Sequence, residues 1–498
     1  FHIIKNISEL SKDWNKSLIF IPILLSFVMC VYAISDPVTT AAQLSSIYNI
    51  IALKFEAVFQ YGALLILLFL ILLAFSKSGS KKINLVSSPK YSFFSWSSML
   101  FASGMGATIL YWSPIEWSAY YNNPPFDLEV GSSEAIRTIN AYTSFHWGFS
   151  GWAIYALPAV AFAIAITKNP SSSLTFGSLL VSDNLPMSYL LKTILDVFFI
   201  FGILAGAGVG LGLSFPLIAE IVATFLGISS SLVLELIILL ICLLIITTSA
   251  YLGITKGIKR LSNINIGLLG LLLIFILIAG PTSYILLNSL DVLLVYGTKF
   301  IEMSTYVGDK FVQDWTVFYW AWWLALAPYL GVFFVNISNG RSLKELILGT
   351  ILIGGFGSVI HFLILGNYSL HLFENDILNL PDLYASEKPT KVIVDVILTL
   401  PMNYLILFLY GLISIIFLCT TYDSCAFILS RTAMSRSDIS PSKILRIIFS
   451  ILLVIQPAIL MYLGGVNTVK WMLVITAIPL IFINILLIGY IIKNVQKI

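Results

Sequence analysis

Long apolar runs separated by short polar joints dominate the sequence. Read at about 20 residues per bilayer crossing, they predict twelve membrane spans. These lie near 17–36, 56–76, 93–121, 140–167, 190–225, 231–253, 262–287, 312–338, 343–366, 402–434, 443–464 and 468–493. Charged residues make up only 10% of the 498 residues, against about 25% in an average soluble domain. The chain is therefore predicted to be an all-α polytopic membrane protein, with nothing left over for a soluble domain.

Basic residues are distributed unevenly between the two sides of these spans. Lysine and arginine favour the cytoplasmic side of short loops. Both termini are therefore expected in the cytoplasm and the protein in the plasma membrane. The sequence begins at Phe1 without a cleavable signal pattern, so the first span is expected to act as its own insertion signal. With this orientation, only seven of the 27 basic residues lie in the outer segments. They are Lys54, Arg137, Lys299, Lys310, Lys388, Lys391 and Lys470.

Residue patterns typical of other functional classes are missing from the sequence. The four histidines are scattered and form no HExxH spacing, which argues against a multi-pass membrane enzyme. A channel would show rings of charge or filter-like carbonyl repeats. No basic block suggests nucleic acid. The four cysteines are predicted to pack within spans without a disulfide or zinc, and they are Cys30, Cys242, Cys419 and Cys425.

The third span contains residues that disturb a helix. In "FASGMGATILYWSPIEW", Gly104 and Gly106 lie near the middle of the span, with Pro114 and Glu116 further along. Glycine weakens a helix, and an unwound turn in lipid frees carbonyls that need partners. Close packing of helices through small residues would also explain the two glycines. A transporter would use such a break to bind substrate and ion near the middle of the membrane.

The tenth span offers a polar group that would suit such a break. Thr420 and Thr421 supply two adjacent hydroxyls, with Asp423 just beyond them. A threonine in a membrane helix usually bonds to its own helix, whereas two hydroxyls that face free carbonyls suit a hard cation. Asp423 is either a functional acid or one half of an ion pair near the inner end of the span.

Aromatic residues cluster in two spans, away from the membrane interfaces where tryptophan usually gathers. Trp315 is expected to be such an interfacial anchor. A quaternary ammonium has no N–H to donate, so aromatic faces suit it, at about 0.5 to 2 kcal/mol per ring. Plain core packing would also explain either cluster alone. The deeper rings are Trp147, Trp152 and Tyr155 in the fourth span, and Trp320, Trp322 and Trp323 in the eighth.

Four of these motifs form a recognisable set. They are "GMG" in the third span, "FHWGFSGWAIY" in the fourth, "DWTVFYWAWW" with "ISNGRS" in the eighth, and "TTYDS" in the tenth. Together they resemble the betaine/carnitine/choline transporter family, over nearly the whole chain. The resemblance implies that family's LeuT-type fold of 12 transmembrane helices, in which two extra helices precede two five-helix inverted repeats.

The resemblance also implies a division of the chain. Residues 1–92 would hold the two peripheral helices, 93–287 the first inverted repeat and 312–493 the second. Residues 288–311 would hold an amphipathic surface helix and a loop at the family's trimer contacts, so a homotrimer is expected. Residues 494–498 would form a short tail.

The function implied by the resemblance is sodium-coupled uptake of a small trimethylammonium compound by alternating access. Betaine, choline, carnitine and trimethylamine are the types of substrate considered. The aromatic box would consist of Trp147, Trp152, Tyr155 and Trp323, with Trp322 at its edge and Thr108 in the pocket. The Na⁺ site would take the backbone carbonyls of Ala102, Met105 and Phe417 and the hydroxyls of Thr420 and Thr421.

Two positions in the pocket depart from the family pattern. Thr108 stands where glycine-betaine carriers have the last glycine of "GMGIG", which narrows the pocket and leaves the identity of the substrate open. Leu326 stands where an aromatic residue usually follows the tryptophan pair. The cytoplasmic part of the pathway is therefore expected to be less aromatic.

Four further positions bear on the coupling ion. The alternative function is sodium-independent exchange, as in the carnitine/γ-butyrobetaine members. There an arginine and a methionine take the places of cations, where this chain has Asn265 and Leu330. Those residues favour true sodium coupling. Ile203 and Ala207 stand where glycine-betaine carriers have the hydroxyls of a second sodium site, and carbon cannot hold a dehydrated ion. One sodium ion per cycle is therefore expected.

Overall fold

The described part of the chain is almost entirely helical. The computed structural model describes residues 11–85, 88–252, 255–435 and 440–498. Within these residues lie ten helical segments long and apolar enough to cross a membrane. The prediction of an all-α polytopic membrane protein is confirmed.

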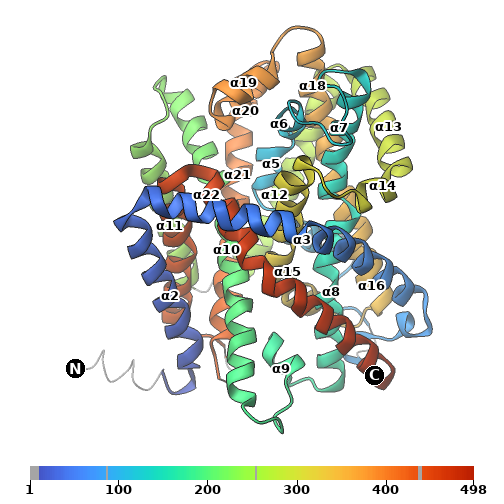
Figure 1. Cartoon of the computed structure of the whole chain (residues 1–498), viewed down its shortest axis with the longest axis vertical. Helices are drawn as coiled ribbons and strands as arrows, with labels where there is room; N and C mark the ends of the chain where they lie inside the picture. Colours follow the sequence, from blue (N-terminus) through green and yellow to red (C-terminus); the bar gives the residue numbers. More distant parts are fainter. Residues whose placement is uncertain (1–10, 86–87, 253–254, 436–439) are drawn as a thin grey trace.

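The helices follow one another through short connections (Figure 1). Three π-helical segments, at Val312–Thr316, Gly349–Gly354 and Phe362–Gly366, fall within the eighth and ninth predicted spans. In chain order the α-helices are α2 (Lys16–Ser35), α3 (Pro37–Phe75), α4 (Phe93–Met105), α5 (Thr108–Trp112), α6 (Glu116–Tyr120), α7 (Ser133–Trp147), α8 (Phe149–Lys168), α9 (Phe176–Leu180), α10 (Ser188–Leu226), α11 (Leu232–Leu252), α12 (Thr255–Ala279), α13 (Thr282–Thr298), α14 (Phe300–Thr305), α15 (Val317–Ile337), α16 (Leu343–Leu348), α17 (Gly355–His361), α18 (Asn367–Glu374), α19 (Leu380–Ser386), α20 (Pro389–Leu398), α21 (Asn403–Thr432) and α22 (Lys443–Asn494).

Most predicted spans coincide with observed helices. The spans predicted at 17–36, 190–225 and 402–434 match α2, α10 and α21 closely, whereas the span predicted at 56–76 is only the second part of α3. The third predicted span consists of the short helices α4, α5 and α6, and the last two share α22. Eleven of the twelve predicted spans therefore fall on the ten long helical segments of the described residues, and the third is divided among short helices.

The seventh predicted span, 262–287, is wrong at its C-terminal end. Helix α12 ends at Ala279, and a new helix, α13, begins at Thr282. Pro281 has no backbone N–H and disfavours a helical conformation of the residue before it. The chain therefore turns at this proline, and residues 282–287 belong to α13.

Helices α8 and α15 form the centre of the molecule. In the segments that contain them, 94% and 89% of the most apolar window is buried, against 22% for α11. Small residues let the two helices approach closely, since a Cβ on Gly331 of α15 would lie 3.0 Å from the Cβ of Pro158 of α8. Apart from Trp147, the last residue of α7, the two predicted aromatic clusters therefore lie on adjoining central helices.

Helix α22 contains the last two predicted spans, 443–464 and 468–493. Its backbone is non-helical at Gly464 (φ −159°) and at Gly465 (φ 64°, ψ −151°). Figure 1 shows α22, in red, bending sharply on its way to the C-terminus. Only glycine adopts the conformation of Gly465 readily. The break expected between the two spans is therefore present at this glycine pair.

We expect Gly465→Ala to lower the thermal unfolding temperature of the detergent-solubilised protein, because an alanine there would be strained by about 1 to 3 kcal/mol. The matched control is Gly489→Ala, at a helical position of α22. Among the described residues, no atom other than those of the two adjacent residues and the neighbouring backbone of the same helix lies within 4 Å of an added Cβ at either site. The control should leave the stability unchanged or raise it by up to about 1 kcal/mol, because alanine favours a helix more than glycine does. Equal unfolding temperatures for the two variants would contradict the backbone conformation at Gly465.

Candidate functional site

The third predicted span is broken in its middle, as its glycines suggested. Helix α4 ends at Met105, and Gly106 follows with φ 59° and ψ −175°, a conformation open almost only to glycine. The last four carbonyls of a helix have no partner within that helix. In α4 these include the carbonyls of Ala102 and Met105. The break therefore presents backbone oxygens in the interior of the protein.

The threonine pair of α21 faces this break. A Cβ added to Gly106 would lie 3.5 Å from the Oγ1 atom of Thr421. Thr420 donates its hydroxyl to the carbonyls of Ile416 (2.9 Å) and Phe417 (3.2 Å). The buried hydroxyl of Thr421, by contrast, has no hydrogen-bond partner in the described structure. One hydroxyl of the pair thus stays with its own helix, and the other is free to bind a ligand.

Two cavities meet at Thr421. The larger one has a volume of about 300 Å³ and is lined in part by Ala102, Thr420 and Thr421. The smaller one, of about 40 Å³, is lined in part by Thr108, Thr421 and Leu326. Thr421 lies in the walls of both cavities. The free hydroxyl therefore stands between them.

Asp423 forms an ion pair in the wall of the larger cavity. Its Oδ1 atom lies 3.3 Å from Nη2 of Arg446 on α22, and the two residues are only 2% and 6% exposed. Of the two alternatives open for Asp423 from the sequence, the structure shows the ion pair.

The aromatic residues of α8 and α15, with Trp147 at the end of α7, form one contiguous cluster. The ring of Trp323 lies 4.4 Å from that of Tyr155, 5.9 Å from that of Trp152 and 6.1 Å from that of Trp147, centroid to centroid. Trp322 joins the cluster 5.8 Å from Trp147. The structure thus brings together the five rings singled out in the sequence. Because Tyr155 and Trp323 touch, a bound ammonium would have to separate them.

Each indole in the cluster has its N–H satisfied by the protein. Trp152 donates to the hydroxyl of Ser358 (2.8 Å), and Trp323 and Trp322 donate to the carbonyls of His146 and Gly206 (both 3.0 Å). The polar edges of these rings are therefore occupied. What remains for a ligand is the ring faces, which suit an apolar or a cationic group.

Glycines allow the close approach of these rings. A Cβ on Gly104 would lie 2.4 Å from the ring of Trp152, and one on Gly354 would lie 2.1 Å from the same ring. Side chains do not come this close, so any larger residue would displace the tryptophan. Both explanations of the third-span glycines therefore apply, since Gly104 serves packing and Gly106 forms the break.

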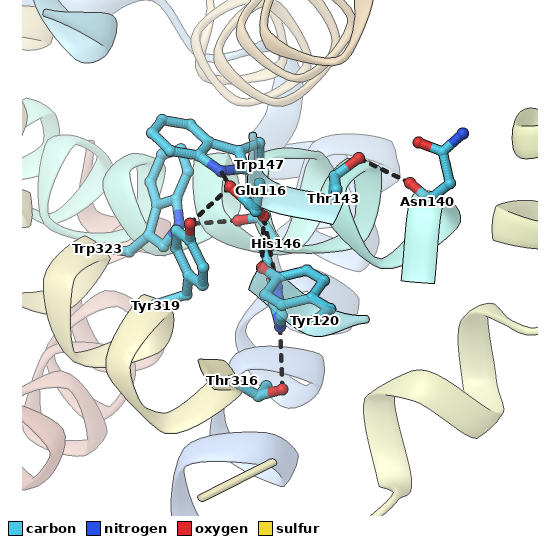
Figure 2. A network of polar contacts seen from close by, with 9 residues as sticks. All are labelled: Glu116, Tyr120, Asn140, Thr143, His146, Trp147, Thr316, Tyr319 and Trp323. Atoms are coloured by element: carbon cyan, nitrogen blue, oxygen red, sulfur yellow. Dashed lines mark hydrogen bonds and ion pairs between the residues drawn. The ribbon is translucent and has the colours of Figure 1, made fainter. Parts of the chain in front are cut away.

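The predicted site missed a buried carboxylate, Glu116, at the start of α6. Glu116 is fully buried and accepts hydrogen bonds from the hydroxyls of Tyr120 (2.5 Å) and Tyr319 (2.6 Å) and from the indole N–H of Trp147 (2.7 Å). Figure 2 shows these donors converging on the carboxylate. Glu116 thus joins the broken span to the end of α7 and to α15, and it fixes the orientation of Trp147.

His146 extends this network. Its Nδ1 atom lies 2.9 Å from the hydroxyl of Tyr120, and its Nε2 atom lies 2.9 Å from that of Thr316 (Figure 2). The sequence signal for the network was the acid Glu116 within an apolar span. Burying such an acid costs free energy unless it is paired. The donors themselves were hidden, because Tyr319 lies 203 residues from Glu116 along the chain.

Trp315 packs against other aromatic residues at the start of the eighth predicted span. It is partly buried, with its ring centroid 4.8 Å from that of Tyr120 and 5.7 Å from that of Trp112. The ammonium of Lys470 lies 4.1 Å from the same ring and 4.4 Å from the ring of Phe318. Trp315 therefore belongs to an aromatic group that already holds a cation.

The positions that bear on the coupling ion lie inside the protein. Asn265 donates to the carbonyl of Ile413 (3.3 Å), while its Oδ1 atom is buried without a partner among the described groups. All four positions are at least 97% buried, and they are Asn265, Leu330, Ile203 and Ala207. None of these side chains carries a charge, and Ile203 and Ala207 bring no side-chain oxygen to α10.

Comparison with known proteins gives a family model that covers most of the chain. The model described as "BCCT, betaine/carnitine/choline family transporter" matches residues 17–498. A carnitine transporter of Acinetobacter baumannii is 30% identical over 449 residues, which are 88% of this chain and 81% of that protein. An ectoine/hydroxyectoine transporter of Virgibacillus pantothenticus is 27% identical over 494 residues, 97% of each chain.

A solved structure shows the same fold. It is that of a Na⁺-coupled sialic acid symporter in a substrate-bound, outward-open state, with a TM-score of 0.50 and 14% identity over 87% of each chain. At this level of identity the similarity concerns the fold alone. The fold is of the LeuT type, as expected from the sequence motifs.

We expect Glu116→Gln to lower thermal stability and substrate affinity. A glutamine has one acceptor oxygen for the three donors, so at least one buried donor would lose its partner, at about 1 to 3 kcal/mol. Glu387→Gln, at an exposed carboxylate, is the matched control and should behave like the wild type. Thermal unfolding and substrate binding of the purified variants measure both effects. Wild-type values for Glu116→Gln would show that the network supports neither the fold nor Trp147.

Proposed function

The chain belongs to the betaine/carnitine/choline transporter family, and we propose that it couples the inward movement of sodium to the uptake of a small methylated-ammonium compound. The observation that carries this proposal is the buried hydroxyl of Thr421, which lacks a partner in the described residues and faces the break after α4. The aromatic cluster of α7, α8 and α15 lies close to this break, since the ring of Trp152 packs against Gly104.

The sodium ion would be held by oxygen atoms of two helices. Backbone carbonyls of Ala102 and Met105 come from the end of α4, and the carbonyl of Phe417 and the hydroxyls of Thr420 and Thr421 come from α21. Hard cations take such oxygen ligands. An unsatisfied buried hydroxyl destabilises a protein by about 1 to 3 kcal/mol. An ion bound to Thr421 would give this hydroxyl a partner and remove that penalty.

The ammonium would bind among Trp147, Trp152, Tyr155 and Trp323, with Trp322 at the edge and Thr108 in the adjoining cavity. The faces of these rings attract a cation that has no N–H to donate. The carnitine transporter among the similar proteins supports a trimethylammonium substrate. Neutral Asn265 and Leu330 argue against the sodium-independent alternative, in which built-in groups replace the ion.

A single sodium ion supplies enough energy for concentrative uptake. At a membrane potential of about 100 mV it contributes roughly 2.3 kcal/mol, and a tenfold gradient adds about 1.4 kcal/mol, enough for roughly 500-fold accumulation of a zwitterion. The aliphatic side chains of Ile203 and Ala207 leave no hydroxyls for a second site on α10. We therefore propose one sodium ion per cycle.

Topology and assembly complete the proposal. The backbone N–H of Asn15 donates to the carbonyl of Ala433 (2.8 Å), and Lys81 donates to the carbonyl of Ile498 (2.8 Å). The start of α2 therefore adjoins the end of α21, and the segment after α3 adjoins the end of α22. Figure 1 shows that α2 begins and α22 ends at the same end of the molecule, which we assign to the cytoplasm from the lysine and arginine bias. The inverted repeats would comprise 93–279, up to the end of α12, and 312–493.

We also propose a homotrimer in the plasma membrane. Helix α13 overlaps the region 288–311, where the family pattern places its trimer contacts. One face of this helix carries large apolar side chains that are 51% to 69% exposed. They are Leu286, Leu287, Leu290 and Leu294.

Uptake into proteoliposomes tests the function directly. Labelled betaine, carnitine, choline and trimethylamine are offered with and without an inward sodium gradient. At least one should accumulate only with the gradient, and its rate should depend on sodium with a Hill coefficient near one. Equal uptake in both conditions would refute sodium coupling.

We expect Thr421→Val to raise the sodium concentration for half-maximal transport about tenfold, equivalent to about 1.4 kcal/mol. Valine keeps the shape of the side chain and removes only the hydroxyl. Thr421→Ser keeps the hydroxyl and should stay close to the wild type. If the two variants show the same sodium dependence, the ion binds elsewhere.

We expect Trp323→Leu to weaken substrate binding, because it removes a ring face that contributes up to about 2 kcal/mol. Trp323→Phe keeps a ring face and serves as the control for loss of the N–H bond to His146. Binding by isothermal titration, with thermal unfolding as the check on folding, separates the two effects. Wild-type affinity in Trp323→Leu would place the substrate away from this ring.

A further inference from the structure

The larger cavity beside Thr421 has the properties of a ligand site in its own right. Its volume of about 300 Å³ suits a small molecule. Asn336, an exposed residue near the end of α15, lines the cavity, so the cavity reaches the surface there. Thr421 connects it with the small cavity at the break. The cavity therefore lies between the aromatic cluster and the side that carries the start of α4 and the ends of α15 and α21.

Arg446 is the unusual group in this cavity. Its side chain is 93% buried, yet among the described residues it makes a single hydrogen bond, from Nη2 to Asp423, at 3.3 Å. Its Nε atom is buried without a hydrogen-bond partner in the described parts of the chain. A guanidinium carries five N–H donors arranged to hold a carboxylate with two of them. Arg446 thus has unused donors in the wall of a cavity that reaches the surface.

The remaining walls suit a methylated ammonium. Tyr329, Phe333 and Phe427 line the same cavity, and the guanidinium carbon of Arg446 lies 5.5 Å from the ring of Phe427. The cavity therefore offers ring faces for a cation beside donors for an anion. The pair of Asp423 and Arg446 is neutral as a whole, so a compound with only a positive charge would gain nothing from the arginine.

We propose that Arg446 binds the carboxylate of the substrate at a second station, on the path between the aromatic cluster and the cytoplasm. The station selects compounds that carry a carboxylate beside the methylated ammonium. This inference rests on the proposed function and narrows its substrate class to zwitterions. Because Thr420 and Thr421 line the same cavity, a sodium ion at the threonine pair would add a positive charge to the station and strengthen its hold on the carboxylate.

A matched pair of ligands tests the proposal, namely glycine betaine and its methyl ester. The two share the trimethylammonium group, and the ester lacks the negative charge. Wild-type protein should bind the acid at least tenfold more tightly than the ester. Removing Arg446 alone would strand the buried charge of Asp423, so the test variant is the charge-neutral double substitution Asp423→Asn with Arg446→Gln. Arg431→Gln, on α21 and outside the walls of this cavity, is the control.

The double variant should lose affinity for the acid about tenfold and keep its affinity for the ester, while Arg431→Gln should retain the preference. Alkylation of Asn336→Cys, at the rim, should be slowed by the acid more than by the ester. Equal binding of the two ligands by the wild type, or a preference that survives the double substitution, would overturn the role of Arg446. Failure of the wild type to bind either ligand would instead count against a trimethylammonium substrate, and with it against the station.

Discussion

A helix that is interrupted inside a membrane has to find partners for its free backbone groups within the protein, because lipid supplies none. Gly106 creates such an interruption at the end of α4. The threonine pair of α21 lies opposite, and the two cavities meet there. The position of one glycine thus fixes where an ion finds oxygen ligands and where a passage through the protein would be narrowest.

Glu116 provides the second fixed point. The segment from α4 to α6 is not a continuous helix. Its own backbone hydrogen bonds therefore do not fix its position against the neighbouring helices. The carboxylate ties it to α7 through Trp147 and to α15 through Tyr319. Because a buried hydrogen-bond network whose members are satisfied rigidifies the groups that it joins, this network gives the interrupted segment a rigid reference on both sides. It also sets the plane of one ring of the aromatic cluster.

The sequence revealed whatever depends on local pattern. Hydropathy located most spans, and the glycines and threonines marked both sides of the break. Partners between distant segments stayed hidden, because periodicity within a helix does not say which neighbour a residue meets. The acid Asp423 was recognisable as half of an ion pair, but Arg446 lies 23 residues on, in the next helix. Pro281 was readable as a helix end, and the apolar run across it masked that signal.

The bond between Glu116 and Tyr319 also has a consequence for biogenesis. The ribosome makes the acceptor 203 residues before this donor, a delay of roughly 10 to 40 s at about 5 to 20 residues per second. Tyr120 and Trp147 lie only 4 and 31 residues from Glu116, so they are the donors that shelter the carboxylate first. The broken segment therefore enters the bilayer with α7 as an incomplete unit, and it reaches its final form only when α15 docks. Insertion of the second half of the chain is thus the step that completes the packing of the first half.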